Sequence, residues 1–379
     1  MKHGPVLLAA LLAAWLAAPL PAAEIYVPAL ELFTLGRTED GVFGLHSRGE
    51  LDLRVEGGYK FGGRLVFGFF SDSLETATQS TEPLLSFKAA GIRIRDIFAL
   101  PLDFAYFLGE QDTFCSGELF DERFGAYPFA SRYPSWLHFP ESSFLYEGIH
   151  TVSGTGFGLD FKLKKDVALL SLHLYQDGHF VEEGPPLSFE YGHWSADLRA
   201  ALNLSKVKLE AFLGATSAAQ SAYGYYRGGL LFYVAEQSVE FLLQAGIPRW
   251  APGEPFGIDL LYLLVEPRVR LGAFSVVPTF FWRPSYFLLK PTEEQAFDIN
   301  LDLGIGKPAE WPIAGGLESN FVYQTEDKTG PVNELRVRLS PYVQFITPGA
   351  LWEVRLNAKI LPFDAGDLLE VLIAVKAGF

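Results

Sequence analysis

The amino-acid sequence predicts an all-β protein: a closed antiparallel β-barrel of about eighteen strands that spans a membrane as a single domain. Three observations lead to this fold class. Apolar and polar residues alternate over many short segments, as they do in strands with one apolar face. Beyond residue 23, no apolar run approaches the ~18 residues that a membrane-spanning helix needs. Short and long links alternate along the chain. A sheet in lipid has to close, because open edges would leave backbone groups unpaired.

The first 23 residues have the composition of a cleaved secretory signal peptide. Lys2 and His3 form a short basic region, and residues 6–16 form an unbroken apolar run. Proline and small residues follow, so we expect cleavage after Ala22 or Ala23. The alternative is an uncleaved helical anchor, for which the apolar run is short and weakly flanked. Residues 24–379 would then form the mature barrel domain.

Alternation is clearest in four internal segments and at the C-terminus. These segments are 50–61, 297–306, 335–345, 352–360 and 369–379. Each would present apolar side chains to lipid and polar side chains to the interior of the barrel. Aromatic residues at segment ends, such as Trp352, fit the girdles at the two membrane interfaces. The last segment ends on an aromatic residue, Phe379.

The links between the segments follow a regular rhythm. Short links are expected at 62–63, 99–101, 164–166, 204–206, 235–237, 272–273, 307–309 and 347–349. Long links are expected at 72–83, 113–153, 177–190, 216–224, 249–256, 284–295 and 326–332. This rhythm gives about seventeen strands from residue 50 onward, and a barrel with both termini on one side needs an even number. Residues 25–35 would supply the missing strand. Sixteen strands is the alternative, if a weak segment such as 25–35 stays outside the wall with its neighbour.

The polar faces of these strands supply candidate functional residues. If the apolar faces contact lipid, the opposite faces line the interior. The residues that we expect to line a pore are Arg93, Arg95, Arg268, Arg270, Arg336, Arg338, Asp298 and Asp302. Rings of such charges would set an ion preference. The alternative is that these residues only brace the wall through ion pairs, without solute specificity.

The long link 113–153 stands out through its many aromatic residues. We expect such a loop to pack against the protein rather than stay in water, and long irregular loops are usually functional. The hypothesis is that it folds inward and narrows the pore. The residues expected at the constriction are Arg123, Tyr127, Arg132, Tyr133 and Trp136. A sharper version makes Tyr127, Tyr133 and Trp136 a stacking track for sugars, and the alternative is a loop that packs on the rim.

Charge and composition argue against other classes of protein. A net charge of −15 disfavours a nucleic-acid partner. The single cysteine, Cys115, cannot form an internal disulfide. The seven histidines are scattered without metal-ligand spacing, so no metal or other cofactor is expected. No motif with an enzymatic mechanism is present, so we expect no enzyme activity.

The signal peptide, the alternation, the rhythm of the links and the terminal Phe379 together resemble the bacterial outer-membrane β-barrel superfamily, in its porin-like branch. The resemblance implies the outer membrane of a diderm bacterium, contact with its lipid, and insertion by the barrel-assembly machinery. It also implies a channel for small hydrophilic solutes and association into homo-oligomers, which porins often show. Three alternatives remain: a surface anchor or adhesin, a fatty-acid-transporter-like barrel for hydrophobic solutes, and a secreted soluble β-sandwich.

Overall fold

A computed structural model describes most of the chain. It covers residues 23–39, 42–58, 60–71, 84–127, 129–131, 148–164, 167–178, 193–217, 224–284, 286–287, 290–291, 295–306, 311–327, 330–365 and 368–377. The signal peptide expected at 1–23 lies outside these ranges except for Ala23, and so does Phe379.

Strands make up most of the described chain. The first half of the wall consists of β1 (Ala23–Glu39), β2 (Val42–Gly57), β3 (Phe61–Ser71), β4 (Leu84–Ile94), β5 (Leu102–Phe114), β6 (His150–Lys164), β7 (Ala168–Asp177), β8 (Trp194–Asn203) and β9 (Val207–Thr216). The second half consists of β10 (Tyr225–Glu236), β11 (Val239–Trp250), β12 (Tyr262–Leu271), β13 (Phe274–Trp282), β16 (Gln295–Ile305), β17 (Ile313–Asp327), β18 (Gly330–Thr347), β19 (Ala350–Leu361) and β20 (Leu369–Ala377). The small elements are α2 (Glu118–Phe124), the 3-10 turns Ile97–Ala99 and Ile258–Leu260, and a separate ribbon of β14 (Tyr286–Phe287) and β15 (Lys290–Pro291).

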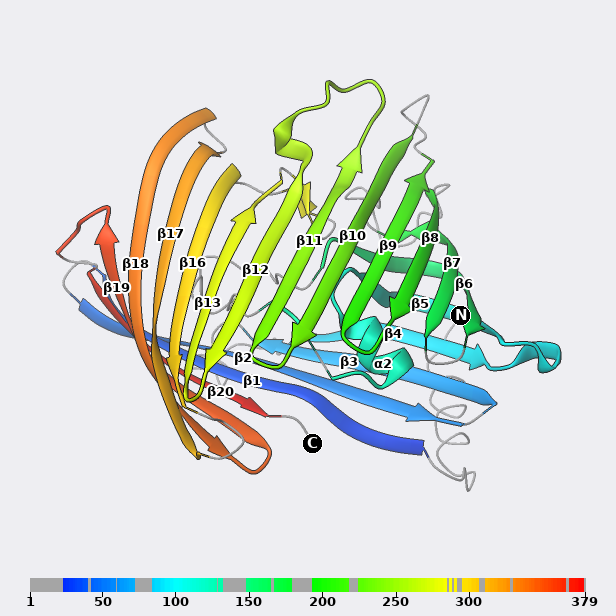
Figure 1. Ribbon diagram of the computed structural model, residues 1–379, viewed down its shortest axis with the longest axis horizontal. Coiled ribbons are helices and arrows are strands. Elements are labelled where there is room, and N and C mark those ends of the chain that lie inside the picture. Colours follow the sequence, from blue (N-terminus) through cyan, green and yellow to red (C-terminus); the bar gives the residue numbers. More distant parts are fainter. Residues whose placement is uncertain are drawn as a thin grey trace, which may run out of the picture.

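Eighteen strands form one antiparallel sheet that closes on itself (Figure 1). Neighbouring strands in the sequence are neighbours in the wall, and β1 pairs with both β2 and β20. The closing pairs run from Leu30 with Ala377 to Arg37 with Glu370. The predicted closed barrel of eighteen strands is therefore confirmed. The sixteen-stranded alternative is wrong, because the segment expected at 25–35 is part of β1 in the wall.

The two faces of the wall differ as the alternation predicts. In β19, Val354 is 43% exposed on the outside, whereas its neighbours Glu353 and Arg355 are 1% and 3% exposed on the inside. In β20, Ile373 is exposed and Glu370 is buried in the same way. No helix in the described ranges has both the length and the apolar composition that crossing a membrane requires. The barrel thus has an apolar outer surface and a polar interior, the arrangement of a strand-built membrane wall.

The two ends of the barrel carry different connections. At one end, links of two or three residues follow β2, β6, β8, β10, β12 and β18. We call this the short-turn end. Most links at the opposite end are longer, and the longest is 115–149 between β5 and β6. This asymmetry matches the predicted rhythm.

Two of the expected links are wrong. Gly62 and Gly63 lie inside β3, where Gly63 pairs with Gly57 of β2. The turn comes earlier, at 58–60, where Gly58 has a left-handed backbone with φ of 89°. The long link expected at 326–332 is instead a tight hairpin, because β17 and β18 pair as far as Asp327 with Gly330.

Candidate functional site

The chain leaves the wall after β5 and enters the barrel. Residues 115–131 of this link, which we call the inward segment, include helix α2, drawn inside the ring of strands in Figure 1. The segment contacts strands on distant parts of the barrel wall. Glu122 Oε1 lies 3.5 Å from Arg54 Nη1 of β2, and Ser131 Oγ donates to Glu266 Oε2 of β12 at 2.7 Å. The segment therefore extends across the interior.

Two glycines shape the inward segment. Gly117 and Gly125 flank α2 with positive φ angles of 95° and 60°. A Cβ atom at Gly117 would lie 2.2 Å from the carbonyl oxygen of Phe129. Only glycine fits this close approach in a left-handed conformation. The backbone thus folds α2 back onto the chain that follows it.

Aromatic packing holds the segment against β10. Phe120 is 0% and Phe129 is 5% exposed, and their ring centroids lie 5.5 Å apart. The Phe129 ring stacks on Tyr233 with centroids 4.0 Å apart and planes 6° apart. Burial of one such side chain is worth about 1.5–3 kcal/mol. These rings belong to a larger buried cluster with Phe114 and Phe212, so the segment is docked along an apolar interior strip.

Polar anchors fix the start and the end of the segment. The backbone N–H of Cys115 donates to Glu210 Oε1 at 2.8 Å, and Gln244 Nε2 donates to the Cys115 carbonyl at 2.5 Å. Arg268 donates through Nη2 to the Ala130 carbonyl. These partners come from β9, β11 and β12, so wall strands supply the hydrogen bonds that this irregular backbone needs.

The Cys115 side chain is itself shielded. It is 0% exposed. Burial, with a further contribution from the Glu210 carboxylate, raises the pKa of its thiol well above the ordinary value. The thiol is therefore neutral and inaccessible while the inward segment is packed against the barrel wall.

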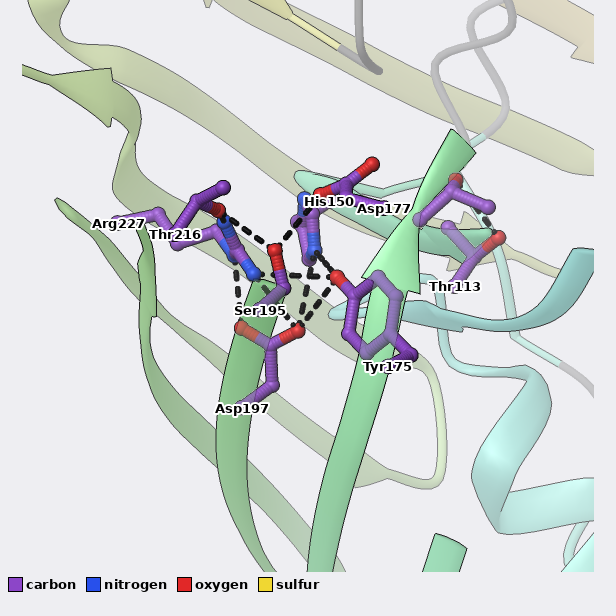
Figure 2. A network of polar contacts seen from close by, with 9 residues as sticks. Thr113, His150, Tyr175, Asp177, Ser195, Asp197, Thr216 and Arg227 are labelled. Carbon is purple, nitrogen blue, oxygen red and sulfur yellow. Dashed lines mark hydrogen bonds and ion pairs between the residues drawn. The ribbon is translucent and has the colours of Figure 1, made fainter. Parts of the chain in front are cut away.

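A buried polar network fixes the wall where the long link rejoins it (Figure 2). Asp197 of β8 accepts two hydrogen bonds from Arg227, Nε to Oδ1 at 2.7 Å and Nη2 to Oδ2 at 2.9 Å. Tyr175 donates its hydroxyl to Asp197 Oδ2 at 2.7 Å and lies 3.1 Å from His150 Nε2. His150 is the first residue of β6. A satisfied network of this kind is rigid, so the wall is well ordered where the link ends.

The opposite side of α2 faces a polar cavity of about 720 Å³, next to β2–β5. We call this cavity the basic pocket. Its cationic side chains are Arg54, Arg64, Arg93, Arg95, Arg123 and Lys162. A larger hollow of about 840 Å³ is different in kind, because it lies on the outer face among exposed residues such as Leu213 and Leu230. The basic pocket is therefore the better candidate for binding a polar ligand.

The sequence-predicted pore residues fall into different surroundings. Arg93 and Arg95 line the basic pocket. Arg268 is buried, with Nη2 2.7 Å from Glu266 Oε1 and Nη1 3.1 Å from Glu240 Oε2. Arg270 is exposed near the short-turn end. Arg268 thus anchors the inward segment, and the two pairs of arginines do not share one pocket.

The remaining predicted pore residues lie on β16 and β18. Arg336 Nη2 lies 3.5 Å from Glu334 Oε2, whereas Arg338 has no carboxylate within 4 Å among the described residues. Asp298 is fully buried and accepts from Arg283 Nη2 at 2.6 Å. Asp302 accepts from the Tyr342 hydroxyl at 2.7 Å. Asp298 is therefore paired with Arg283 inside the wall.

The predicted constriction residues are described only in part. Arg123 lies on α2, with Nη2 2.8 Å from Asp160 Oδ2 of β6. Tyr127 is 89% exposed. Arg132, Tyr133 and Trp136 lie outside the described residues, so the stacking track is not placed.

Several residues of the site were not predicted from the sequence. Tyr175, Arg227, Tyr233 and Gln244 all lie on interior faces and take part in the contacts above. A signal was available for Gln244, because it has the same strand parity as Glu240. Nothing in the sequence pairs Gln244 with Cys115, since that contact spans 129 residues.

Comparisons with known proteins bear on the fold. No protein-family model matches the sequence, and no curated protein matches it. The structure is similar to that of Pseudomonas aeruginosa OccK8 (OprE), with a TM-score of 0.53 and 9% identity over 96% of this chain and 99% of that chain. Two mutants of Rh. blastica porin each give a TM-score of 0.50 over 94% of this chain and 100% of theirs, at 10% and 11% identity. The chain therefore has the barrel fold of bacterial outer-membrane porins.

Proposed function

We propose that the protein is a passive channel in a bacterial outer membrane, through which small hydrophilic solutes cross a charged interior. The observation that carries this proposal is the contrast between the apolar outer face and the charged interior of a closed wall. An unpaired charge in a dry core costs several kcal/mol. An interior with this many acids and bases is suited to water and to polar solutes.

The inward segment would set the width of the path. It is docked against β9–β12 through Cys115, Phe129 and Ser131. The basic pocket lies on its other side, along β2–β5. We infer that solutes pass on the pocket side, beside Arg93, Arg95 and Arg123. The charged composition of this side favours hydrophilic over hydrophobic solutes.

Other parts of the proposal rest on the resemblance to outer-membrane barrels. Residues 1–23 would be removed during export, and the short-turn end would face the periplasm. The barrel-assembly machinery would insert the chain through its last strand, and copies would associate in the outer membrane. Arg336, Arg338 and Asp302 would belong to the pore surface.

Conductance tests the proposal directly. The purified full-length protein, added to a planar bilayer in KCl, should give stepwise currents that grow in proportion to voltage. The same amount of protein unfolded by heat should give none. Liposomes that contain the folded protein should also admit a neutral solute such as erythritol. Absence of both currents and solute uptake would contradict the channel and favour a surface anchor.

A further inference from the structure

The basic pocket has a defined position in the barrel. It lies at the short-turn ends of β2–β6, because its lining includes Gly58 and Arg95, which border the turns, and Lys162, near the end of β6. Helix α2 contributes Glu122 and Arg123 to the same lining. The pocket thus lies between the wall and the inward segment, near the short-turn end of the interior.

Positive charge in the pocket exceeds negative charge. Lys162 Nζ lies 3.0 Å from Asp103 Oδ1 and 3.6 Å from Asp96 Oδ1, and Arg123 Nη2 lies 2.8 Å from Asp160 Oδ2. The other lining cations are Arg54, Arg64, Arg93 and Arg95, and the described lining residues include two carboxylates, those of Glu56 and Glu122. The described residues that line the pocket thus carry more positive than negative charge.

The ion pairs of these two carboxylates are long. Arg54 Nη1 lies 3.5 Å from Glu122 Oε1 and 3.9 Å from Glu56 Oε1, and Arg64 Nε lies 3.7 Å from Glu56 Oε1. Strong charge-assisted hydrogen bonds are about 2.7–2.9 Å long. These three contacts are longer than the 2.6 Å pair of Arg283 and Asp298 in the wall.

Arg64, Arg93 and Arg123 have donors without a close acceptor among the described residues. Arg93 is half-buried, and no described carboxylate lies within 4 Å of its guanidinium. The Nε atoms of Arg64 and Arg123 are buried without a hydrogen-bond acceptor among the described residues. A partly buried guanidinium without an acceptor is costly, so a ligand that supplies oxygen acceptors would be bound favourably.

The wall also leaves room for such a ligand. Gly62, Gly91 and Ala105 line the pocket where larger side chains would fill it. A Cβ atom at Gly62 would lie no closer than 3.5 Å to its neighbours. A larger residue there can be accommodated by the wall while it takes up pocket volume.

We propose that the basic pocket binds small organic anions that carry two or more carboxylate or phosphate groups. The proposal rests on the proposed channel function, because such anions would reach the pocket through the interior. Guanidinium groups recognise both oxyanions through paired N–H donors. Several guanidinium groups around one cavity favour an anion with more than one oxyanion group, and the volume of about 720 Å³ accommodates a small organic molecule.

Calorimetric titration of the detergent-solubilised full-length protein tests this site, with citrate and pyrophosphate as probes and acetate as the monoanion control. Citrate or pyrophosphate should bind at least about tenfold more tightly than acetate, and binding should weaken in 1 M salt, where the Debye length is ~3 Å. If only one of the two probes binds, that result supports the site and identifies its chemistry.

Variants locate the binding. Arg93→Gln should weaken citrate binding by about tenfold or more, and Arg93→Lys should restore part of it, because lysine keeps the charge but not the paired donors. Gly62→Leu should weaken binding without any change of charge. Arg270→Gln removes an arginine elsewhere and should leave binding unchanged. Circular dichroism checks that each variant keeps its strands.

The outcomes separate this proposal from the channel itself. If the protein conducts KCl but neither citrate nor pyrophosphate binds, the pocket proposal fails and the channel stands. If citrate binds but no current flows, the pocket stands and the channel fails. Wild-type affinity in folded Arg93→Gln and Gly62→Leu proteins would also overturn the pocket proposal.

Discussion

The inward segment can be tested with the only cysteine in the chain, because Cys115 lies at the start of that segment and is fully buried. Its thiol should react only when the inward segment detaches from the barrel wall. Phe129→Ala would remove the ring that stacks on Tyr233 at 4.0 Å. The alkylation rate of Cys115 therefore reports how often the inward segment detaches from the barrel wall.

The expected magnitude follows from the burial of Phe129. Truncation of a buried phenylalanine to alanine costs about 3–5 kcal/mol, and Phe129 is 5% exposed. Each 1.4 kcal/mol changes an equilibrium about tenfold. If the whole cost falls on the state in which the inward segment packs against the wall, the detached population should rise by roughly 10²- to 10⁴-fold. The alkylation rate should rise in proportion.

The assay is maleimide labelling at neutral pH, followed by intact mass. Tyr127→Ala is the matched control, because Tyr127 lies in the same segment but is 89% exposed, and its removal should leave the rate unchanged. Equal rates for Phe129→Ala and wild type would refute the account of how the segment is held. So would wild-type labelling as fast as that of the unfolded protein.

Three other predictions concern the wall, the pore and pH. Val354→Arg should reduce the yield of assembled barrel, since arginine on the lipid face at mid-membrane costs about 2–4 kcal/mol; the interior change Gln344→Arg should be tolerated better, and equal loss in a membrane-fraction assay would contradict the assignment of faces. Replacing Arg336 and Arg338 by Glu should shift reversal potentials toward cation selectivity, less so in 1 M salt, where the Debye length is ~3 Å; an unchanged potential would remove them from the pore. Burial raises the pKa of the Cys115 thiol, so its stabilising effect is complete below the ordinary thiol pKa of about 8.5 and is lost as pH rises above it. Wild type should therefore lose more melting temperature than Cys115→Ala between about pH 7 and pH 10, and parallel losses would show that the thiol does not contribute.

The sequence predicts the wall well because lipid imposes a simple pattern on it. Each strand needs one apolar face, so period-two alternation survives in β19, where Val354 and Glu353 face opposite ways. The same rule places Asp302 and Arg338 on polar faces. Because both termini are expected on one side of the membrane, an even number of strands follows without knowledge of any contact.

Turn positions are predicted less well where residue type and pairing disagree. Gly62 and Gly63 are residues that favour a turn, yet they lie in β3. Gly62 pairs there with Arg93 of the neighbouring strand β4. The true turn uses Gly58. At 326–332, Pro331 suggests a loop, but it lies in a strand, paired with Glu326.

The partners of the inward segment could not be predicted. Its aromatic content indicates burial, and Phe120 and Phe129 are buried. Their wall partners depend on how strands far apart in the sequence face one another across the barrel. The contact of Cys115 with Glu210 spans 95 residues, and that of Ser131 with Glu266 spans 135. Local pattern carries no information about such contacts.

Single-channel conductance before and after removal of residues 118–144 tests the central claim most directly. The narrowest section dominates the resistance of a pore, and the inward segment crosses the interior from Arg54 to Glu266. The wild-type protein should conduct, and the shortened protein should conduct several times more in the same salt. A folded, membrane-inserted protein that gives no current in either form, or the same current in both, would contradict a channel narrowed by this segment.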